Sequence, residues 1–253
     1  MTIKQPDLQQ IPALRVLWKE AFGDTDAFLD TFWNTAFSAD RCRCVTVDDC
    51  LAAALYWFDC EHMGNRLAYI YAVATGREYQ GRGVCRALIE DTHDHLTARG
   101  YRGVVLVPGN EALFAMYAGM GYGSGMQILE FSCAAAGNAV AVQSVDAKTY
   151  GRLRRAMLPE NAVIQEGENL DFLQSQAELY AGTDFLLAAR REGDTLEGIE
   201  LLGNKGAASG ILRALGCAYG MFRMPGTGKP FAMYRALGAG DTPAPAYFGI
   251  AFD

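Results

Sequence analysis

The chain has 253 residues, of which 51% are apolar and 20% charged, and its formal net charge is −7. This composition is typical of a globular protein with a hydrophobic core, and an acidic chain without a Lys/Arg-rich run is not expected to bind nucleic acid. No stretch approaches the ~20 apolar residues that span a bilayer, and the N-terminus lacks a signal-peptide pattern. We therefore expect a cytoplasmic protein with no membrane or nucleic-acid partner.

The cysteines are seven in number, and no two of them form a C-x-x-C pair. Cys42 and Cys44 alternate along a predicted strand, but no second pair completes a zinc site. We therefore expect free thiols in a reducing compartment, and no bound metal.

The first half of the chain alternates between helical and strand patterns. Residues 13–22 have apolar side chains at helical spacing and end at Gly23, and residues 24–37 form a second amphipathic helix that begins at Asp24 and Thr25. The remaining predicted elements of this half are strands at 41–47, 51–63, 66–75, 101–107 and 126–132 and helices at 84–100 and 110–121.

A tract of small residues at 133–141 is the expected domain boundary, which divides the chain into residues 1–135 and 136–253. The elements predicted after it are strands at 142–145, 218–224 and 246–253, helices at 147–158, 167–180 and 206–216, and a hairpin at 184–203. This order is similar to that of the first half and suggests an internal duplication.

One short sequence occurs in both halves. Residues 114–117 read FAMY, and residues 231–234 read FAMY again, with matching Pro, Gly and Gly positions around them. If the chain is duplicated at this point, residues 229–237 form a helix like residues 110–121. After Pro230 they fit equally well an edge strand that pairs with residues 246–253.

Residues 79–89, YQGRGVCRALI, follow a predicted strand and begin a predicted helix. Backbone N–H groups in the first turn of a helix have no carbonyl partner and lie at the positive end of its dipole, so they can bind a phosphate or diphosphate. Gly81 and Gly83 permit a close approach of the ligand. The pattern is neither a Rossmann fingerprint nor a P-loop.

Two motifs in this half resemble those of the GCN5-related N-acetyltransferases, the GNAT superfamily. Gln80, Gly83 and Cys85 are similar to its motif A, (Q/R)-x-x-G-x-(G/A), with Cys in the last position. Residues 110–122, NEALFAMYAGMGY, are similar to its motif B. The resemblance covers roughly residues 13–131 and implies an α/β (α+β) fold with a mixed, mostly antiparallel sheet flanked by helices.

The resemblance also implies the residues that bind the co-substrate, acetyl-CoA. Its pantetheine arm is expected on the backbone of Val73, Ala74 and Thr75, and Asn110 is expected near its thiol end. Its diphosphate is expected on the loop formed by Gln80, Gly81, Arg82, Gly83, Val84 and Cys85. Tyr117 is the implied general acid, which returns a proton to the leaving thiolate, and a backbone N–H of the strand at 66–75 stabilises the oxyanion.

Several of these residues also have a purely structural interpretation. Tyr117 fits a core tyrosine, Asn110 fits a helix cap, and Cys85 is expected to pack rather than react. His93 and His95 lie two positions apart on a helix, so they face different directions, and we expect both to face solvent rather than bind a metal.

The general base is left open by the sequence. The predicted strand at 66–75 carries no acid, and the nearest carboxylates are those of Glu20, Asp24, Asp26 and Glu61. Each of them is also compatible with a simple surface position.

The second half keeps few of these motifs. Gly203 replaces Gln80, Thr227 replaces Asn110, and Tyr234 is retained. We therefore expect a degenerate GNAT-like domain that supplies structure, as in the tandem acetyltransferases of the enhanced intracellular survival type that the chain resembles. That resemblance implies a second half that walls the acceptor cleft and a C-terminus, here Asp253, that reaches toward the active site.

The function implied is acetyl-CoA-dependent transfer of an acetyl group to a small-molecule or peptide amine, by direct attack in a ternary complex. The alternatives are a non-catalytic acyl-CoA-binding or regulatory module and an aminoacyl-transferase of the same fold. The sequence leaves open which amine is used and whether the chain forms a homodimer.

Overall fold

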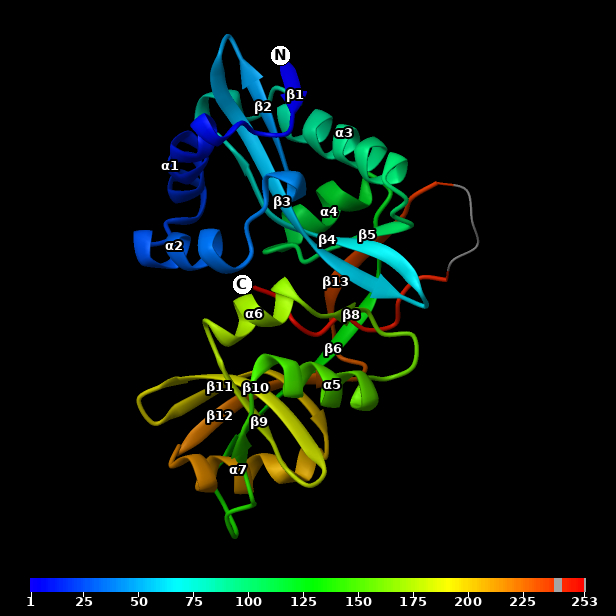
Figure 1. The fold of residues 1–253 in the computed structure, drawn as a ribbon. Coiled ribbons are helices and arrows are strands. Elements are labelled where there is room, and N and C mark those ends of the chain that lie inside the picture. The colour runs from blue at the N-terminus through cyan, green and yellow to red at the C-terminus, as the bar shows by residue number, and fades with distance from the viewer. Residues whose placement is uncertain (239–242, 253) are drawn as a thin grey trace.

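The computed structural model describes residues 1–238 and 243–252. Figure 1 shows two lobes, with the first half of the chain in the upper lobe and most of the second half in the lower one. Strands of both lobes belong to one 13-stranded sheet. Within the described residues, no helix is long and apolar enough to cross a membrane.

The first half forms the upper lobe and the strand that leaves it. Its elements are β1 (Thr2–Lys4), α1 (Ile11–Phe22), α2 (Asp26–Thr35), β2 (Cys42–Val47), β3 (Cys50–His62), β4 (Asn65–Thr75), α3 (Val84–Ala98), β5 (Gly103–Leu106), α4 (Glu111–Ala118) and β6 (Gly123–Ala134). Apart from β1, which was not predicted, they follow the predicted order.

Local sequence explains how α1 and α2 meet. Gly23 ends α1 with φ at +75°, a conformation in which glycine has no steric penalty. Thr25 then begins α2, and its side chain accepts the Phe28 N–H at 3.2 Å. The two helices bury Trp18 and Phe32 against each other, with ring centroids 4.8 Å apart.

The second half repeats this order of elements with one addition, the short strand β8, and one omission. Its elements are β7 (Gln143–Ser144), α5 (Ala147–Met157), β8 (Ile164–Gln165), α6 (Glu168–Gln174), β9 (Glu178–Ala181), β10 (Phe185–Glu192), β11 (Thr195–Gly203), α7 (Ala208–Leu215), β12 (Tyr219–Pro225) and β13 (Lys229–Ala236). A parallel pair joined through a helix occurs in each half, β4 with β5 and β11 with β12. No helix corresponding to α4 separates β12 from β13, because only residues 226–228 lie between them.

The last strands of the two halves are exchanged. The order along the sheet is β1-β2-β3-β4-β5-β13-β6-β12-β11-β10-β9-β7, with β8 paired to β3 outside this path. Strand β13 therefore lies beside β5 of the first half, and β6 lies beside β12 of the second. β13 and β6 also pair with each other, so the two halves share backbone hydrogen bonds through two strands.

This exchange shows that the two copies of FAMY differ in structure. Residues 114–117 lie in helix α4, whereas residues 231–234 lie in strand β13. The expectation of a second helix at this point is wrong. The strand alternative is correct in type, but β13 is an internal strand between β5 and β6 and not an edge strand.

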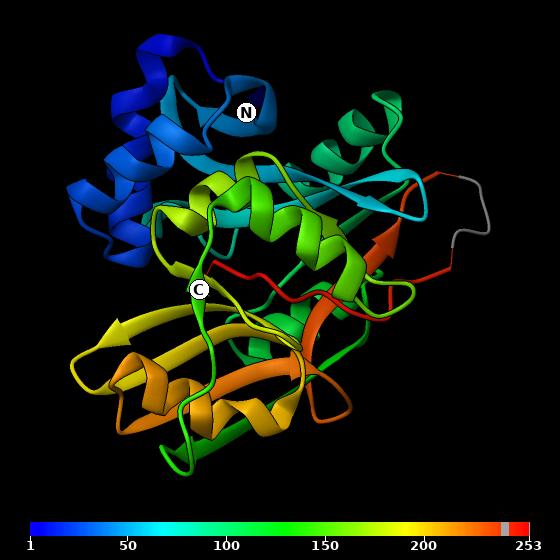
Figure 2. The same ribbon diagram turned by 60° about the horizontal axis from the view of Figure 1, so that its bottom comes forward.

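Two further expectations are corrected. The helix expected at 167–180 ends at Gln174, and its last part is strand β9. Residues 243–252 form no strand apart from a bridge between Tyr247 and Ala162. Figure 2 shows this C-terminal segment running between the lobes, where Phe248, Ile250 and Phe252 are buried. The expected role of Asp253 lies outside the described residues.

Candidate active site

The cavity that carries the site begins where β4 and β5 separate. Their parallel pairing runs only from Leu67 to Tyr69 on β4 and from Gly103 to Val105 on β5. Beyond this point, residues 70–73 and 106–109 line a cavity of about 700 Å³. The edge of β4 that faces away from β3 is therefore open to an added extended ligand.

A bulge in β4 shapes this edge. Ala72 has φ at +49°, and the register of β4 against β3 shifts between Ala74 and Tyr71. Of the three residues expected to bind the pantetheine arm, Val73 lines the cavity. Ala74 and Thr75 follow it on the same strand, paired with β3 through their other edge.

The predicted diphosphate loop joins β4 to α3. Gly81 and Gly83 have φ values of +72° and +79°, and Gly83 begins α3 without a side-chain cap. The Gln80 side chain donates to the Thr75 carbonyl at 3.1 Å, which ties the loop to the end of β4. The first N–H groups of α3 consequently face outward without a capping acceptor, as an anion-binding helix start requires.

Of the other side chains of this loop, Val84 is buried in the core, and Arg82 and Cys85 do not show reactive features. Arg82 is exposed. Burial raises the pKa of the Cys85 thiol, with a smaller opposing contribution from Thr75, so the thiol is not activated. This agrees with a packing role for Cys85.

Tyr117 lies on α4 and lines the cavity. Tyr117 as a whole is only 6% exposed, but its hydroxyl oxygen keeps some contact with solvent. Within the described chain this hydroxyl has no hydrogen-bond partner. Burial raises the pKa of Tyr117 above its ordinary value. The phenol therefore stays protonated at neutral pH and is available to donate to a molecule in the cavity.

A buried polar pair lies behind Tyr117. The ring of Tyr122 meets that of Tyr117 edge to face, with centroids 5.5 Å apart, and its hydroxyl lies 2.7 Å from Nε2 of His93. The expectation that His93 faces solvent is wrong, because the residue is only 4% exposed. Burial and the Arg235 guanidinium lower its pKa to about 4.

Asn110 acts as a helix cap, which was the alternative to coenzyme contact. Its side chain caps α4 by accepting the Leu113 N–H at 3.0 Å. It is exposed beside Gly109, which lines the cavity. The cap fixes the start of the helix that carries Tyr117.

Of the four carboxylates considered as general base, Asp24 is the one that lines the cavity. Its Oδ2 accepts the indole N–H of Trp18 at 2.7 Å. Glu20 instead accepts the Arg77 backbone N–H, and Asp26 pairs with Lys19 at 2.8 Å on the surface.

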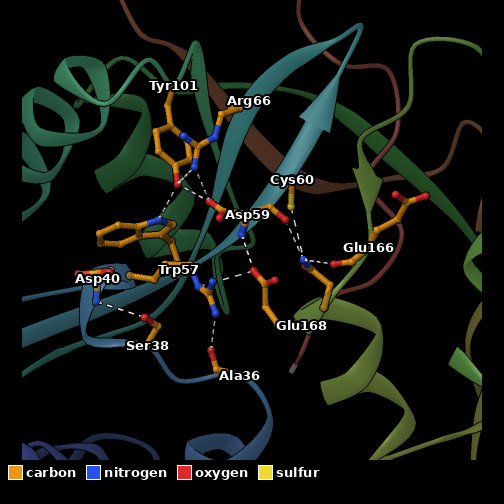
Figure 3. A network of polar contacts seen from close by, with 12 residues as sticks. Ala36, Ser38, Asp40, Trp57, Asp59, Cys60, Arg66, Tyr101, Glu166 and Glu168 are labelled. Atoms are coloured by element: carbon orange, nitrogen blue, oxygen red, sulfur yellow. Dashed lines mark hydrogen bonds and ion pairs between the residues drawn. The ribbon is translucent and has the colours of Figure 1, made fainter. Parts of the chain in front are cut away.

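Glu61 belongs to a different part of the molecule. Figure 3 shows the neighbouring polar network, in which Glu168 accepts the Asp59 N–H at 2.9 Å and Asn169 donates to the Asp59 carbonyl at 2.8 Å. These contacts attach α6 to β3. Glu61 pairs with Arg155 beside this network, at 3.6 Å, and does not line the cavity.

Among its described residues, the second half contributes three to the cavity wall: Gln176, Arg190 and Phe252. The ring of Phe252 packs against Tyr71 and Phe172, with centroids 5.8 and 4.9 Å apart. No motif identified these residues, because their segments are separated in sequence and meet only in the folded chain. The sole signal was the apolar C-terminal run that includes Phe252.

A buried ion pair holds the C-terminal segment in this place. Arg154 and Glu200 are 1% and 0% exposed, and their closest atoms, Nε and Oε2, lie 2.6 Å apart. Tyr247 donates to the same carboxylate at 3.0 Å, and Gln165 donates to the Ile250 carbonyl at 2.7 Å. Buried charges need such complete pairing, so this network fixes the path that leads to Phe252.

No group of three or more His, Cys, Asp or Glu side chains among the described residues is arranged to hold a metal ion. The described cavity instead combines an open strand edge, an uncapped helix start nearby, a protonated phenol and one carboxylate. These are the parts required for acyl transfer from a thioester without a nucleophilic side chain.

Comparison with known proteins identifies the family. The model of the acetyltransferase (GNAT) domain matches residues 2–125, whereas no curated protein matches the chain. A GCN5-related N-acetyltransferase from Kribbella flavida has a TM-score of 0.71 at 18% identity, covering 93% of this chain and 70% of that one.

Two other solved structures extend the likeness into the second half. Eis1 from Mycobacterium abscessus has a TM-score of 0.65 at 11% identity, covering 88% of this chain and 65% of that one. A putative acetyltransferase from Pyrococcus horikoshii has a TM-score of 0.61 at 12% identity, covering 98% and 93%. At these identities the likeness concerns the fold alone. The family match shows that residues 2–125 form a GNAT acetyltransferase domain.

Proposed function

We propose that the protein is an acetyl-CoA-dependent N-acetyltransferase that acts on a primary amine by direct attack in a ternary complex. The observation that supports this most strongly is the cavity between β4 and β5, which Tyr117 lines and beside which α3 begins without a cap. In this proposal the loop 80–85 binds the diphosphate of the coenzyme, and the open edge of β4 binds its pantetheine arm.

The chemistry assigned to Tyr117 follows from its protonation state. The amine nitrogen bonds to the thioester carbonyl carbon, a β4 backbone N–H stabilises the oxyanion, and the carbon–sulfur bond then breaks. Tyr117 donates its proton to the thiolate that leaves, and solvent restores the phenol. The raised pKa of Tyr117 suits this role, because the group must carry its proton before each turnover.

The proton that the amine loses is assigned to Asp24. Its carboxylate lines the same cavity and is oriented by the Trp18 N–H. An ammonium ion cannot attack a carbonyl, so a carboxylate at this position would first hold the cation and then accept a proton from it.

A turnover assay tests the proposal and separates it from the alternatives. Purified protein is incubated with acetyl-CoA and a panel of primary amines, and thiol release and acetylated product are both measured. Product with at least one amine, strongly reduced in Tyr117→Phe, supports the proposal. Coenzyme binding without turnover would favour a non-catalytic module, and acceptance of aminoacyl-tRNA in place of acetyl-CoA would favour an aminoacyl-transferase.

A further inference from the structure

Five aromatic rings from several segments of the chain line the cavity together with Tyr69 and Tyr117. Trp18 and Phe22 come from α1, Phe28 from α2, Tyr71 from β4 and Phe252 from the C-terminal segment. The Trp18 centroid lies 5.7 Å from that of Phe22, 6.4 Å from that of Phe28 and 5.6 Å from that of Tyr71. We call these five rings the aromatic wall.

The charges of this cavity are few. Asp24 and Arg190 are the two charged side chains in its described lining, and they have opposite signs. A polyamine or an aminoglycoside carries several ammonium groups, and each of these needs a carboxylate or other acceptor when it leaves water. The described lining offers only one carboxylate, so it is poorly matched to a polycation.

The position of that carboxylate selects a particular kind of amine. The Trp18 N–H donates to Oδ2 of Asp24, so an ammonium that pairs with this carboxylate lies at the border of the aromatic wall. The body of the same molecule then contacts the aromatic wall, which favours apolar groups and rings.

We propose that the acceptor is a monoamine with an apolar body, of the arylalkylamine class, held by Asp24 at its amine and by the aromatic wall at its ring. This inference rests on the proposed function. Phe252 is assigned a specificity-determining role, because it closes the wall from the second half of the chain and is fixed there by its contacts with Tyr71 and Phe172.

The test compares primary amines that differ in the body attached to the amino group. Initial rates with acetyl-CoA are measured for phenethylamine, ethylamine, spermidine and kanamycin. Since each methylene in an apolar pocket changes discrimination by roughly 10- to 200-fold, phenethylamine is expected to exceed the other three in kcat/KM by at least about tenfold. A higher kcat/KM for spermidine or kanamycin overturns the inference.

Variants of the aromatic wall make the test specific. Phe252→Ala should lower kcat/KM for phenethylamine by about tenfold or more, and by a larger factor than it lowers kcat/KM for ethylamine. Phe22→Ala is a second variant of the same kind, and its side chain is 46% exposed, so the fold should tolerate it. Tyr219→Ala removes a similarly exposed aromatic of β12 outside the cavity and serves as the matched control. Equal losses in all three variants would contradict the assignment.

A direct binding measurement distinguishes this inference from the proposed function. Phenethylamine is titrated calorimetrically into the protein with CoA present. If no amine is acetylated but phenethylamine binds, and Phe22→Ala weakens that binding, the proposed function fails and the assigned site stands. If other amines are acetylated and phenethylamine does not bind, the assigned acceptor class fails and the proposed function stands.

Discussion

Burial sets the protonation state of Tyr117 and so determines the pH range in which it can act. Its raised pKa lies above the ordinary value near 10 because the phenolate would lose its hydration. We expect Tyr117→Phe to lower kcat by roughly 10²- to 10⁴-fold, as loss of a general acid does, with little change in the Kd for CoA. The wild-type enzyme should show no alkaline decline of kcat from this group below about pH 10. An unchanged kcat in Tyr117→Phe would show that Tyr117 only packs in the core and is not the general acid.

The lowered pKa of His93 leads us to expect a pH dependence of stability rather than of catalysis. Its folded pKa of about 4 lies below its unfolded value near 6.5. Above pH 6.5 the residue is neutral in both states and contributes no pH dependence. As the pH falls from 6.5 to 4 the unfolded chain binds a proton that the folded chain does not, so stability decreases, by up to about 3 kcal/mol.

The measurement for His93 is denaturant unfolding at a series of pH values. His93→Gln should remove most of the stability loss between pH 6.5 and 4, although it also loses the contact with Tyr122. His95→Gln is the matched control on the same helix: His95 is partly exposed and burial lowers its pKa too, so this variant should remove a smaller part of the loss. Identical pH profiles for wild type and His93→Gln would refute the assignment.

Among the elements, the loop that begins α3 permits a controlled test. Gly83 and Gly100 lie at the two ends of α3, both have φ near +80°, and a Cβ added at either would meet no atom within 4 Å. Valine at either position therefore carries a similar backbone strain, about 1–2 kcal/mol. We expect Gly83→Val to weaken CoA binding at least tenfold in a calorimetric titration and Gly100→Val to leave it nearly unchanged. Equal CoA affinities in both variants would show that the diphosphate does not bind to this loop.

The buried pair that holds the C-terminal segment is a second test at this scale. Glu200→Leu leaves Arg154 buried without its partner and should lower the free energy of unfolding by about 3–5 kcal/mol. The double variant Arg154→Leu/Glu200→Leu removes both charges and should recover much of this loss. If the double variant loses as much free energy of unfolding as Arg154→Leu and Glu200→Leu lose together when each is measured alone, the pair does not act as a unit.

The elements show which parts of the structure the sequence could predict. The positions of α1, α2 and α3 depend on local spacing and capping, so residues close together in the sequence predicted them correctly. The run PFAMYRAL was ambiguous because a short apolar segment fits a helical and a strand period equally well. Its place between β5 and β6 is decided by pairing with strands about a hundred residues away.

The candidate site shows the same contrast between residues that a local sequence pattern predicts and residues that only the folded chain brings together. The loop glycines and Tyr117 carry motifs, and Asp24 follows a helix-ending glycine. Gln176, Arg190 and Phe252 have no such signal, since they reach the cavity only through the exchange of strands and the anchored C-terminal segment. His93 was expected to face solvent, but Tyr122, which directly precedes β6, packs against it in the folded chain.

For the whole molecule, the exchanged strands mean that the halves cannot be separated without breaking the sheet. A fragment that ends near Ala136 lacks β13, so it exposes the edge of β5 and the apolar surface that Phe231 and Met233 cover. Unpaired strand edges and large apolar patches promote aggregation. The sequence alone suggested two domains in which the first binds coenzyme by itself; the shared sheet argues instead for mutual dependence.

A cleavable linker tests this dependence with the full chain as its own control. A protease site is inserted after Gly137, an exposed residue between β6 and β7. After cleavage the two pieces should elute together in size-exclusion chromatography and keep CoA affinity within about twofold, because β6 and β13 still pair across the cut. The fragment 1–136 expressed alone should be insoluble or bind CoA at least tenfold more weakly. Pieces that separate after cleavage, with a soluble first half that binds CoA normally, would show that the halves are independent domains.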